Sequence, residues 1–241
     1  MYKVQYEDKE IEYTLTKSKR KTVGIKITNN GEVKVSAPLR ASNKAIEDIV
    51  YKKAKWIVEK LKAARENQNK VKKKELINGA TISLLGKEYE LRVEEVLIRG
   101  ASVKFDGSVF NIRLNKDLNY EGKQQFIKEV LTLWMRKKAK EVFEGRTKYY
   151  ANELKLFPKR ITIKDQKTLW GSCSSKDNIN FNWRLIMSPI EILDYVVVHE
   201  LCHLKHRNHS KEYWDYVEET TPDYADRRKW LKDNGGALMN M

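Results

Sequence analysis

All four histidines of the 241-residue chain lie between positions 199 and 209. Two of them, His199 and His203, are four residues apart, and Glu200 follows the first in the pattern H-E-x-x-H. On an α-helix, residues at this spacing are separated by about 40° around the axis and by one turn along it, so both imidazoles can reach one metal ion. We therefore expect a metal site on a helix at this motif.

Glu200 lies about 100° around the same helix from His199, beside the histidine pair rather than against the ion. A carboxylate in that place can accept a proton from a water molecule at the metal, which is the role of a general base. The apolar run Tyr195–Val198 predicts a buried helix, where histidines need partners. The pattern predicts metal-assisted hydrolysis, with Zn²⁺ as the cofactor and Glu200 as the catalytic residue.

A catalytic zinc ion takes three protein ligands and keeps one open position. His206 lies on the same helix face but about 10.5 Å along the axis from His199, so one straight helix cannot bring it to the same ion. His209 can return to the ion if the helix ends, and Arg207–Asn208 is the expected turn because asparagine tolerates the left-handed conformation. We expect His209 to be the third metal ligand.

An alternative third ligand lies on the next helix, which is expected from Lys211 to about Glu219 with Ser210 as its cap. Glu218 or Glu219 could serve there, as a downstream glutamate does in thermolysin-like enzymes. His206 is expected at the surface.

The remaining elements must position this motif. Ser188-Pro189-Ile190-Glu191 predicts the start of the metal helix through a capping box. Ser42 is expected to cap a basic amphipathic helix that runs to about Glu66, and Asn67–Lys74 is a candidate linker. We detect no internal repeat. Strands are expected at residues 11–15, 23–27, 33–37, 81–85, 88–93, 102–105, 109–114 and 160–163, a long helix at 122–152, and a hairpin from 168–172 and 179–185.

Composition limits the classes of protein. Lys and Arg number 48 against 33 Asp and Glu, a net charge of +15, and 41% of the residues are hydrophobic, which is enough for a folded core. The basic residues are mostly interspersed with acidic ones, so the charge permits a nucleotide or nucleic acid partner without requiring one. No apolar run is long enough to span a membrane, and the start lacks a signal peptide, so we expect no membrane partner. With only Cys173 and Cys202, a cytoplasmic protein is expected.

Several segments accompany the histidine motif. They are Trp170–Cys173, Asn180–Pro189, Asn208–Ser210 and Trp214, with Lys19–Thr22 and Val33–Pro38 in the first third. With these segments the chain resembles the YgjP-like family of predicted zinc metallopeptidases, relatives of the SprT and WLM groups, over nearly its whole length. The resemblance implies that His199, His203 and His209 are zinc ligands and that Glu200 is the general base. The metzincin spacing also matches, but His206 stands where metzincins have the glycine of their turn.

Four further residues are candidates for contacts with a substrate or an oxyanion: Trp170, Gly171, Ser172 and Tyr213. In zinc peptidases an edge strand beside the metal helix pairs with the extended substrate, and a glycine permits close approach. The alternative is that this hairpin only packs Trp170 and Cys173 into the core. His206 and Asn182 are further candidates for the oxyanion donor.

These observations predict an α+β fold with a β-rich amino-terminal region and a basic helix at residues 1–117. A zincin-like metallopeptidase region, with a long helix, a short sheet and the H-E-x-x-H helix, is expected at residues 118–241. The expected function is zinc-dependent hydrolysis of polypeptides. The alternatives are a metal-dependent nucleoside triphosphate pyrophosphatase and a DNA-associated protease or binding module.

Overall fold

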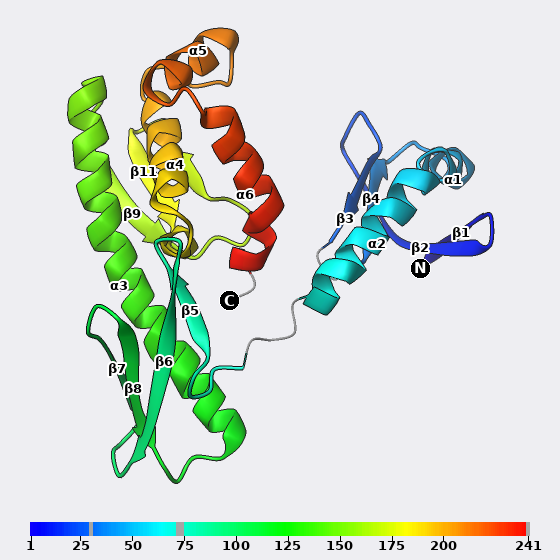
Figure 1. Ribbon diagram of the computed structural model, residues 1–241. Helices are drawn as coiled ribbons and strands as arrows, with labels where there is room; N and C mark the ends of the chain where they lie inside the picture. Colours follow the sequence, from blue (N-terminus) through cyan, green and yellow to red (C-terminus); the bar gives the residue numbers. More distant parts are fainter. Residues whose placement is uncertain (29–30, 71–74, 240–241) are drawn as a thin grey trace. The chain divides into compact units, whose positions relative to one another are not determined.

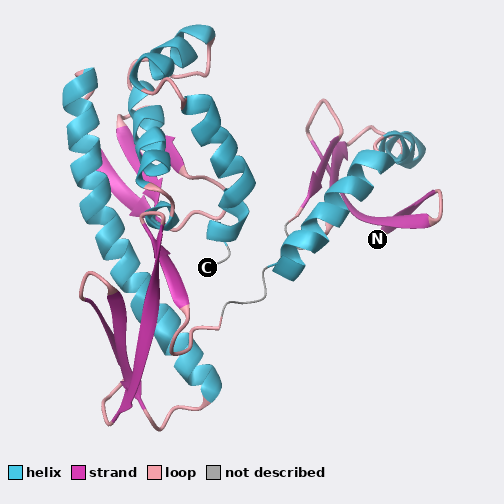
Figure 2. Cartoon of the chain, viewed as in Figure 1, coloured by secondary structure: helices cyan, strands magenta, loops and turns pink. Residues whose placement is uncertain are grey.

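The computed structural model describes residues 1–28, 31–70 and 75–239. The fold is α+β, as the sequence predicts, and Figure 2 shows the mixture of helices and strands. Contacts divide the chain into two compact units, Met1–Lys74 and Glu75–Met241, which we call unit 1 and unit 2. None of the described helices combines the length and the apolar composition that crossing a bilayer requires.

Unit 1 is a four-stranded sheet covered by helices, with strand order β1-β2-β4-β3 (Figure 1). Alternate residues of β4 are buried, namely Val33, Val35 and Ala37, because one sheet face packs against the helices. The elements are β1 (Tyr2–Tyr6), β2 (Lys9–Ser18), β3 (Gly24–Ile27), β4 (Val33–Pro38), α1 (Asn43–Lys52) and α2 (Ala54–Lys70).

The basic helix of unit 1 begins where the sequence predicts. Ser42 caps α1, and its side chain accepts a hydrogen bond from the Ala45 amide at 3.2 Å. The prediction of one continuous helix is wrong, because the backbone at Lys53 has φ −99° and ψ 4° and separates α1 from α2. The expected linker from Asn67 lies partly within α2, and its residues 71–74 fall outside the described residues.

Unit 2 begins with a second four-stranded sheet, order β5-β6-β8-β7, followed by the long helix α3. Asn119 caps α3 by accepting a hydrogen bond from the Gly122 amide at 2.8 Å. The elements are β5 (Thr81–Leu84), β6 (Lys87–Val96), β7 (Ala101–Phe105), β8 (Val109–Asn115) and α3 (Tyr120–Leu154).

The two four-stranded sheets have the same topology. In each, the first two strands are antiparallel, the second and fourth are parallel, and the third and fourth are antiparallel. Val4 faces Ile11 in unit 1 as Ile82 faces Tyr89 in unit 2. A capped helix follows each sheet. The chain therefore contains a structural repeat, which sequence analysis did not detect because hydrophobicity is kept at these positions while residue identity is not.

The rest of unit 2 carries the histidine motif. A three-stranded sheet of order β10-β11-β9 leaves β10 at an edge, and β10 and β11 form the predicted hairpin. The elements are β9 (Arg160–Lys164), β10 (Gly171–Cys173), β11 (Asn178–Asn182), the 3₁₀ helix η1 (Trp183–Met187), α4 (Ile190–Cys202), α5 (Lys211–Thr220) and α6 (Tyr224–Met239).

The metal helix α4 is held against α3 by an ion pair. Arg146 donates two hydrogen bonds of 2.6 Å to the carboxylate of Asp194, whose residue is 6% exposed. Removing Arg146 would leave the buried Asp194 carboxylate without its partner, which is destabilising. The pair therefore fixes α4 relative to the long helix.

The start of α4 differs from the predicted capping box. The helix begins at Ile190 with Pro189 as the N-cap residue and no side-chain cap. The Ser188 hydroxyl donates instead to the carbonyl of Leu185 at 2.7 Å, because η1 immediately precedes the helix and offers that acceptor.

One hydrophobic core joins β5–β8 to α3 and α4. Leu91 and Phe110 of the sheet and Leu193 and Val197 of α4 belong to the same buried cluster, whereas unit 1 has a separate cluster. Packing thus divides the chain after Lys74. The division into functional regions at residues 1–117 and 118–241 stays a prediction.

Candidate metal centre

The turn after α4 brings the third histidine back to the motif. The helix ends at Cys202, with His203 as its C-cap residue, and α5 begins at Lys211. The expected left-handed turn at Asn208 is wrong, since Asn208 does not have a positive φ. The helix ends earlier, where the backbone amide of His203 donates to the carbonyl of Leu201. Residues 203–210 therefore all belong to the loop that brings His209 back to the motif.

His199, His203 and His209 form one cluster. Each offers a ring nitrogen, and these atoms all lie within 4.8 Å of one another. The Nε2 atoms of His199 and His209 are 3.3 Å apart. Two nitrogens bound to one tetrahedral zinc at about 2.0–2.1 Å would be separated by about 3.4 Å, so this spacing fits a shared ion.

Backbone contacts orient two of the rings. His203 Nδ1 lies 3.0 Å from the carbonyl oxygen of His206. A carbonyl can only accept, so Nδ1 carries the proton and Nε2 keeps its lone pair for a metal, as is common around metal-bound histidines. Tyr213 is fully buried, and its hydroxyl donates to the carbonyl of His199 at 3.0 Å while its ring stacks on His203. His209 stacks on Trp214.

The environments of His199 and His203 favour neutral imidazoles. Burial lowers the pKa of His199 to about 3, with further lowering from His203 and His209. Burial also lowers the pKa of His203. Neutral imidazole is the form that binds metal. The Nδ1 atom of His199, the ring nitrogen other than the Nε2 that lies near His209, is buried without a hydrogen-bond partner in the described part of the chain.

Glu200 is the buried carboxylate beside the cluster. It is 4% exposed, and its Oε2 atom has no hydrogen-bond partner among the described residues. Burial raises its pKa to about 8. A carboxylate whose pKa lies close to neutrality is suited to accept and return a proton.

Gly171 packs directly on the Glu200 side chain. A Cβ atom at Gly171 would lie 2.7 Å from Cγ and 2.8 Å from Cδ of Glu200, closer than such contacts normally are. Glycine is therefore required where β10 crosses α4, and it limits where the carboxylate can lie.

In the described sheet β10 pairs only with β11, so no strand covers its other edge. Asn182 donates its amide to the Trp170 carbonyl, and the Ser174 amide donates to Asn178. Inward-bonded and outward-facing residues alternate along an antiparallel strand, so Gly171 and Cys173 present their backbone groups to the free edge. An extended chain could pair there.

Other predicted residues are engaged elsewhere. The Asn182 side chain is fully buried and donates to the carbonyls of Gln166 and Leu169, and Ser172 Oγ accepts from Asn180. Trp170 packs against Gly235 of α6. The Tyr213 hydroxyl has one proton and already donates it to the carbonyl of His199. It could donate to an oxyanion only if that hydrogen bond broke.

The alternative ligands are not in the cluster. Glu218 and Glu219 lie exposed on α5, outside the histidine group found among the described residues. Sequence reasoning missed Arg228 of α6, whose guanidinium lies 4.9 Å from the ring centre of Trp214 and lowers the pKa of His199. No spacing signal connects Arg228 to the motif, because it reaches the centre only through the fold.

Comparisons with curated proteins and with solved structures find no match. A family model, described as YgjP-like, metallopeptidase domain, matches residues 21–234. The matched range runs from unit 1 through α6 and contains every residue of the cluster. The chain belongs to the YgjP-like metallopeptidase-domain family.

Proposed function

We propose that the protein is a zinc-dependent peptidase in which His199, His203 and His209 bind the metal and Glu200 is the general base. One observation carries the proposal: the ring nitrogens of three histidines lie within 4.8 Å of one another, beside a buried carboxylate whose Oε2 atom has no hydrogen-bond partner among the described residues. Family membership supports the general class of reaction.

The chain's own groups supply the proton transfers. Zinc at such a site polarises a carbonyl and brings the pKa of water toward about 7. Glu200 accepts a proton from water as the oxygen bonds to the carbonyl carbon. It then delivers that proton to the amine nitrogen as the C–N bond breaks. Gly171 keeps the carboxylate in place for both steps.

An extended polypeptide suits the open edge of β10. The outward backbone groups of Gly171 and Cys173 would hold the substrate beside Glu200. A phosphoanhydride has no backbone to pair with a strand, and nothing in the described residues favours a nucleotide or DNA substrate. We therefore expect unfolded polypeptide as the substrate class.

The test compares three variants with full-length protein purified without added metal. Glu200→Gln should keep zinc and lower the rate of casein hydrolysis by about 10² or more, the usual contribution of a positioned proton-transfer group. His209→Ala should lose zinc. His206→Ala is the matched control and should keep zinc, because its backbone carbonyl remains.

Elemental analysis and product detection decide the outcome. Unchanged hydrolysis by Glu200→Gln would rule out its role as the base. Full zinc retention by His209→Ala would transfer the third ligand position to another group, with Glu218 and Glu219 tested next. Hydrolysis of nucleoside triphosphates without any polypeptide cleavage would overturn the proposed substrate class.

A further inference from the structure

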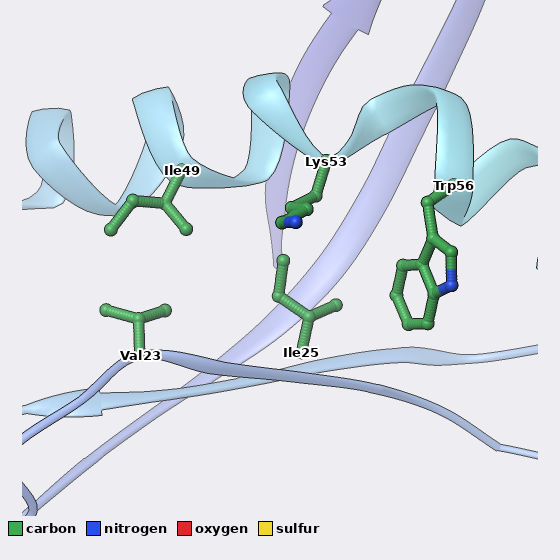
Figure 3. Close-up of a pocket in the computed structure, with 5 residues that line it drawn as sticks. All are labelled: Val23, Ile25, Ile49, Lys53 and Trp56. Atoms are coloured by element: carbon green, nitrogen blue, oxygen red, sulfur yellow. The ribbon is translucent and has the colours of Figure 1, made fainter.

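A groove in unit 1 lies between its edge strand and its helices (Figure 3). It has a volume of about 270 Å³. Figure 3 shows Val23, just before β3, and Ile25 of β3 on one side of the space, and three residues of the α1–α2 segment on the other. The lining residues are Val23, Ile25, Ile49, Lys53 and Trp56.

The groove exposes large apolar side chains. Trp56 is 40% exposed and Ile49 is 37% exposed, while Val23 and Ile25 are only partly buried. Apolar side chains gathered in a hollow mark a binding surface more strongly than scattered ones do.

The repeat in unit 2 allows the groove residues of unit 1 to be compared with their counterparts. Ile25 pairs with Val35 as Val103 pairs with Ile112, and the helix caps Ser42 and Asn119 bring the two helices into register. In that register the residues matching Ile49, Lys53 and Trp56 are Phe126, Val130 and Leu133.

At the equivalent position of unit 2, Phe126 and Val130 lie near the strand, whereas Leu133 is 69% exposed. A Cβ atom at Gly100, the residue before β7, would lie 3.9 Å from the ring of Phe126, so this ring is next to the start of the strand. Val130 and Val103 both pack against the core. At the first two of these positions unit 1 has a smaller Ile49 and a charged Lys53 instead, and its aromatic residue is Trp56 at the third.

The charge at the groove is positive. Lys53 is exposed at the centre of the lining and forms no ion pair within the described residues. Residues 1–62 contain 15 Lys and Arg against 8 Asp and Glu. Four of those acidic residues, Glu7, Asp8, Glu10 and Glu12, lie on or between β1 and β2, at the sheet edge opposite β3. A carboxylate is the matching group for Lys53.

The edge strand supplies the third part of the site. β3 pairs only with β4 in the described sheet, so its other edge is free. An unpaired strand edge next to a helix can accept an extended peptide as a further strand, with alternate side chains entering the groove.

We propose that β3 binds an extended polypeptide segment whose large apolar side chain fills the groove and whose neighbouring carboxylate pairs with Lys53. Backbone pairing with β3 supplies affinity, and the groove selects the side chain. The site is independent of the reaction at the histidine cluster.

The test measures peptide binding to full-length protein carrying Glu200→Gln, by fluorescence anisotropy. The probe is a fluorescein-labelled decapeptide with one phenylalanine flanked by glutamates in a serine and threonine background. Ile49→Phe, which copies the residue of unit 2, should weaken binding at least tenfold. Lys53→Glu should do the same and should bind better to the probe with lysines in place of its glutamates.

Matched controls separate the groove from general effects. Leu133→Ala alters the unit 2 residue that matches Trp56 and should leave binding unchanged, whereas Trp56→Ala should weaken it severalfold. Thermal unfolding checks that each variant folds, and Trp56→Ala replaces Ile49→Phe if the latter does not. A probe with alternate amides methylated should lose binding.

Three outcomes would overturn the proposal. One is equal binding by Ile49→Phe, or by Trp56→Ala where it replaces that variant. Another is equal binding of a probe with serine in place of phenylalanine. The third is tighter binding of a 20-base-pair DNA duplex that depends on Trp56 and Lys53, which would assign the surface to nucleic acid. Loss of casein hydrolysis plays no part in this test, so the two proposals fail separately.

Discussion

The sheet and helix of unit 1 and their copy in unit 2 follow the same path but have different cores. In unit 1, α1 contributes Val50, and α2 contributes Ala54 and Ile57, to a separate cluster. The copy has larger side chains at matching positions, and Trp134 packs edge-on against Phe105 and Phe110. The same sheet topology thus surrounds a separate core in unit 1 and forms one part of a larger core in unit 2.

The turn between the first two strands of the unit 2 sheet contacts the start of the metal helix. In unit 2 the Leu85 amide donates to the carbonyl of Ile186 at 2.7 Å, and Gly86 lies against Pro189 at the start of α4. The matching turn in unit 1, Glu7–Asp8, is exposed except for part of its backbone. The unit 2 repeat therefore supports the start of the helix that carries the histidines, and the unit 1 repeat carries the groove proposed above to bind a peptide.

Two truncations should show the largest difference between unit 1 and the β5–β8 sheet of unit 2. Removal of residues 1–74 should leave a folded, zinc-binding unit 2, because no residue of the unit 1 core belongs to the unit 2 core. Expression of residues 118–241 should give insoluble protein, since α3 and α4 would lose the β5–β8 face of their core. Circular dichroism and zinc analysis report both results. A cooperatively folded, zinc-bound 118–241 fragment would contradict the shared core.

A matched pair of core substitutions should separate the two units by energy. Ile127→Ala in α3 should destabilise unit 2 by about 2–5 kcal/mol and weaken zinc retention, because it leaves a cavity in the shared core. Val50→Ala removes less volume at the matching position and should destabilise unit 1 by about 1–2 kcal/mol without affecting zinc. Hydrogen exchange resolved by peptide measures each unit. Equal effects on both units from either variant would show that the cores are coupled.

Much of this arrangement could be predicted from the sequence, because local signals decided it. The alternating strands, the cap at Ser42 and the H-E-x-x-H spacing each predict structure within a few residues of themselves. The start of α4 was predicted wrongly because η1 offers the Ser188 hydroxyl an acceptor at Leu185, and its end was predicted wrongly because the helix stops at Cys202, before the expected turn. Contacts such as Gly171 on Glu200 depend on strands far apart in sequence, which no local pattern reveals.

A substitution in the turn between β5 and β6 should have a smaller effect than the truncations and core substitutions. Gly86 has φ 77°, and a Cβ atom there would lie 2.8 Å from Pro189 Cα. Gly86→Ala should therefore destabilise unit 2 by about 1–3 kcal/mol, through backbone strain and the clash at the start of α4. Asp8→Ala at the matching position has no such neighbour and should change stability by less than about 0.5 kcal/mol. Urea unfolding followed by hydrogen exchange measures both, and a Gly86→Ala variant of unchanged stability would remove the turn as a support.

The smallest effect concerns the buried Glu200 carboxyl group of unit 2. Burial raises the pKa of Glu200 from 4.5 to about 8. Between these values the folded, metal-free protein holds a proton that the unfolded chain has released, so the free energy of unfolding falls as pH rises. His199, with its pKa lowered to about 3, acts in the opposite sense below pH 6.5, so the useful window is pH 6.5 to 8. Metal-free unit 2 should lose about 1 kcal/mol per pH unit there, and Glu200→Gln should remove the loss. Hydrogen exchange in unit 1 should show the same stability at both ends of the window, and a slope in unit 2 that survives Glu200→Gln would assign the proton to another group.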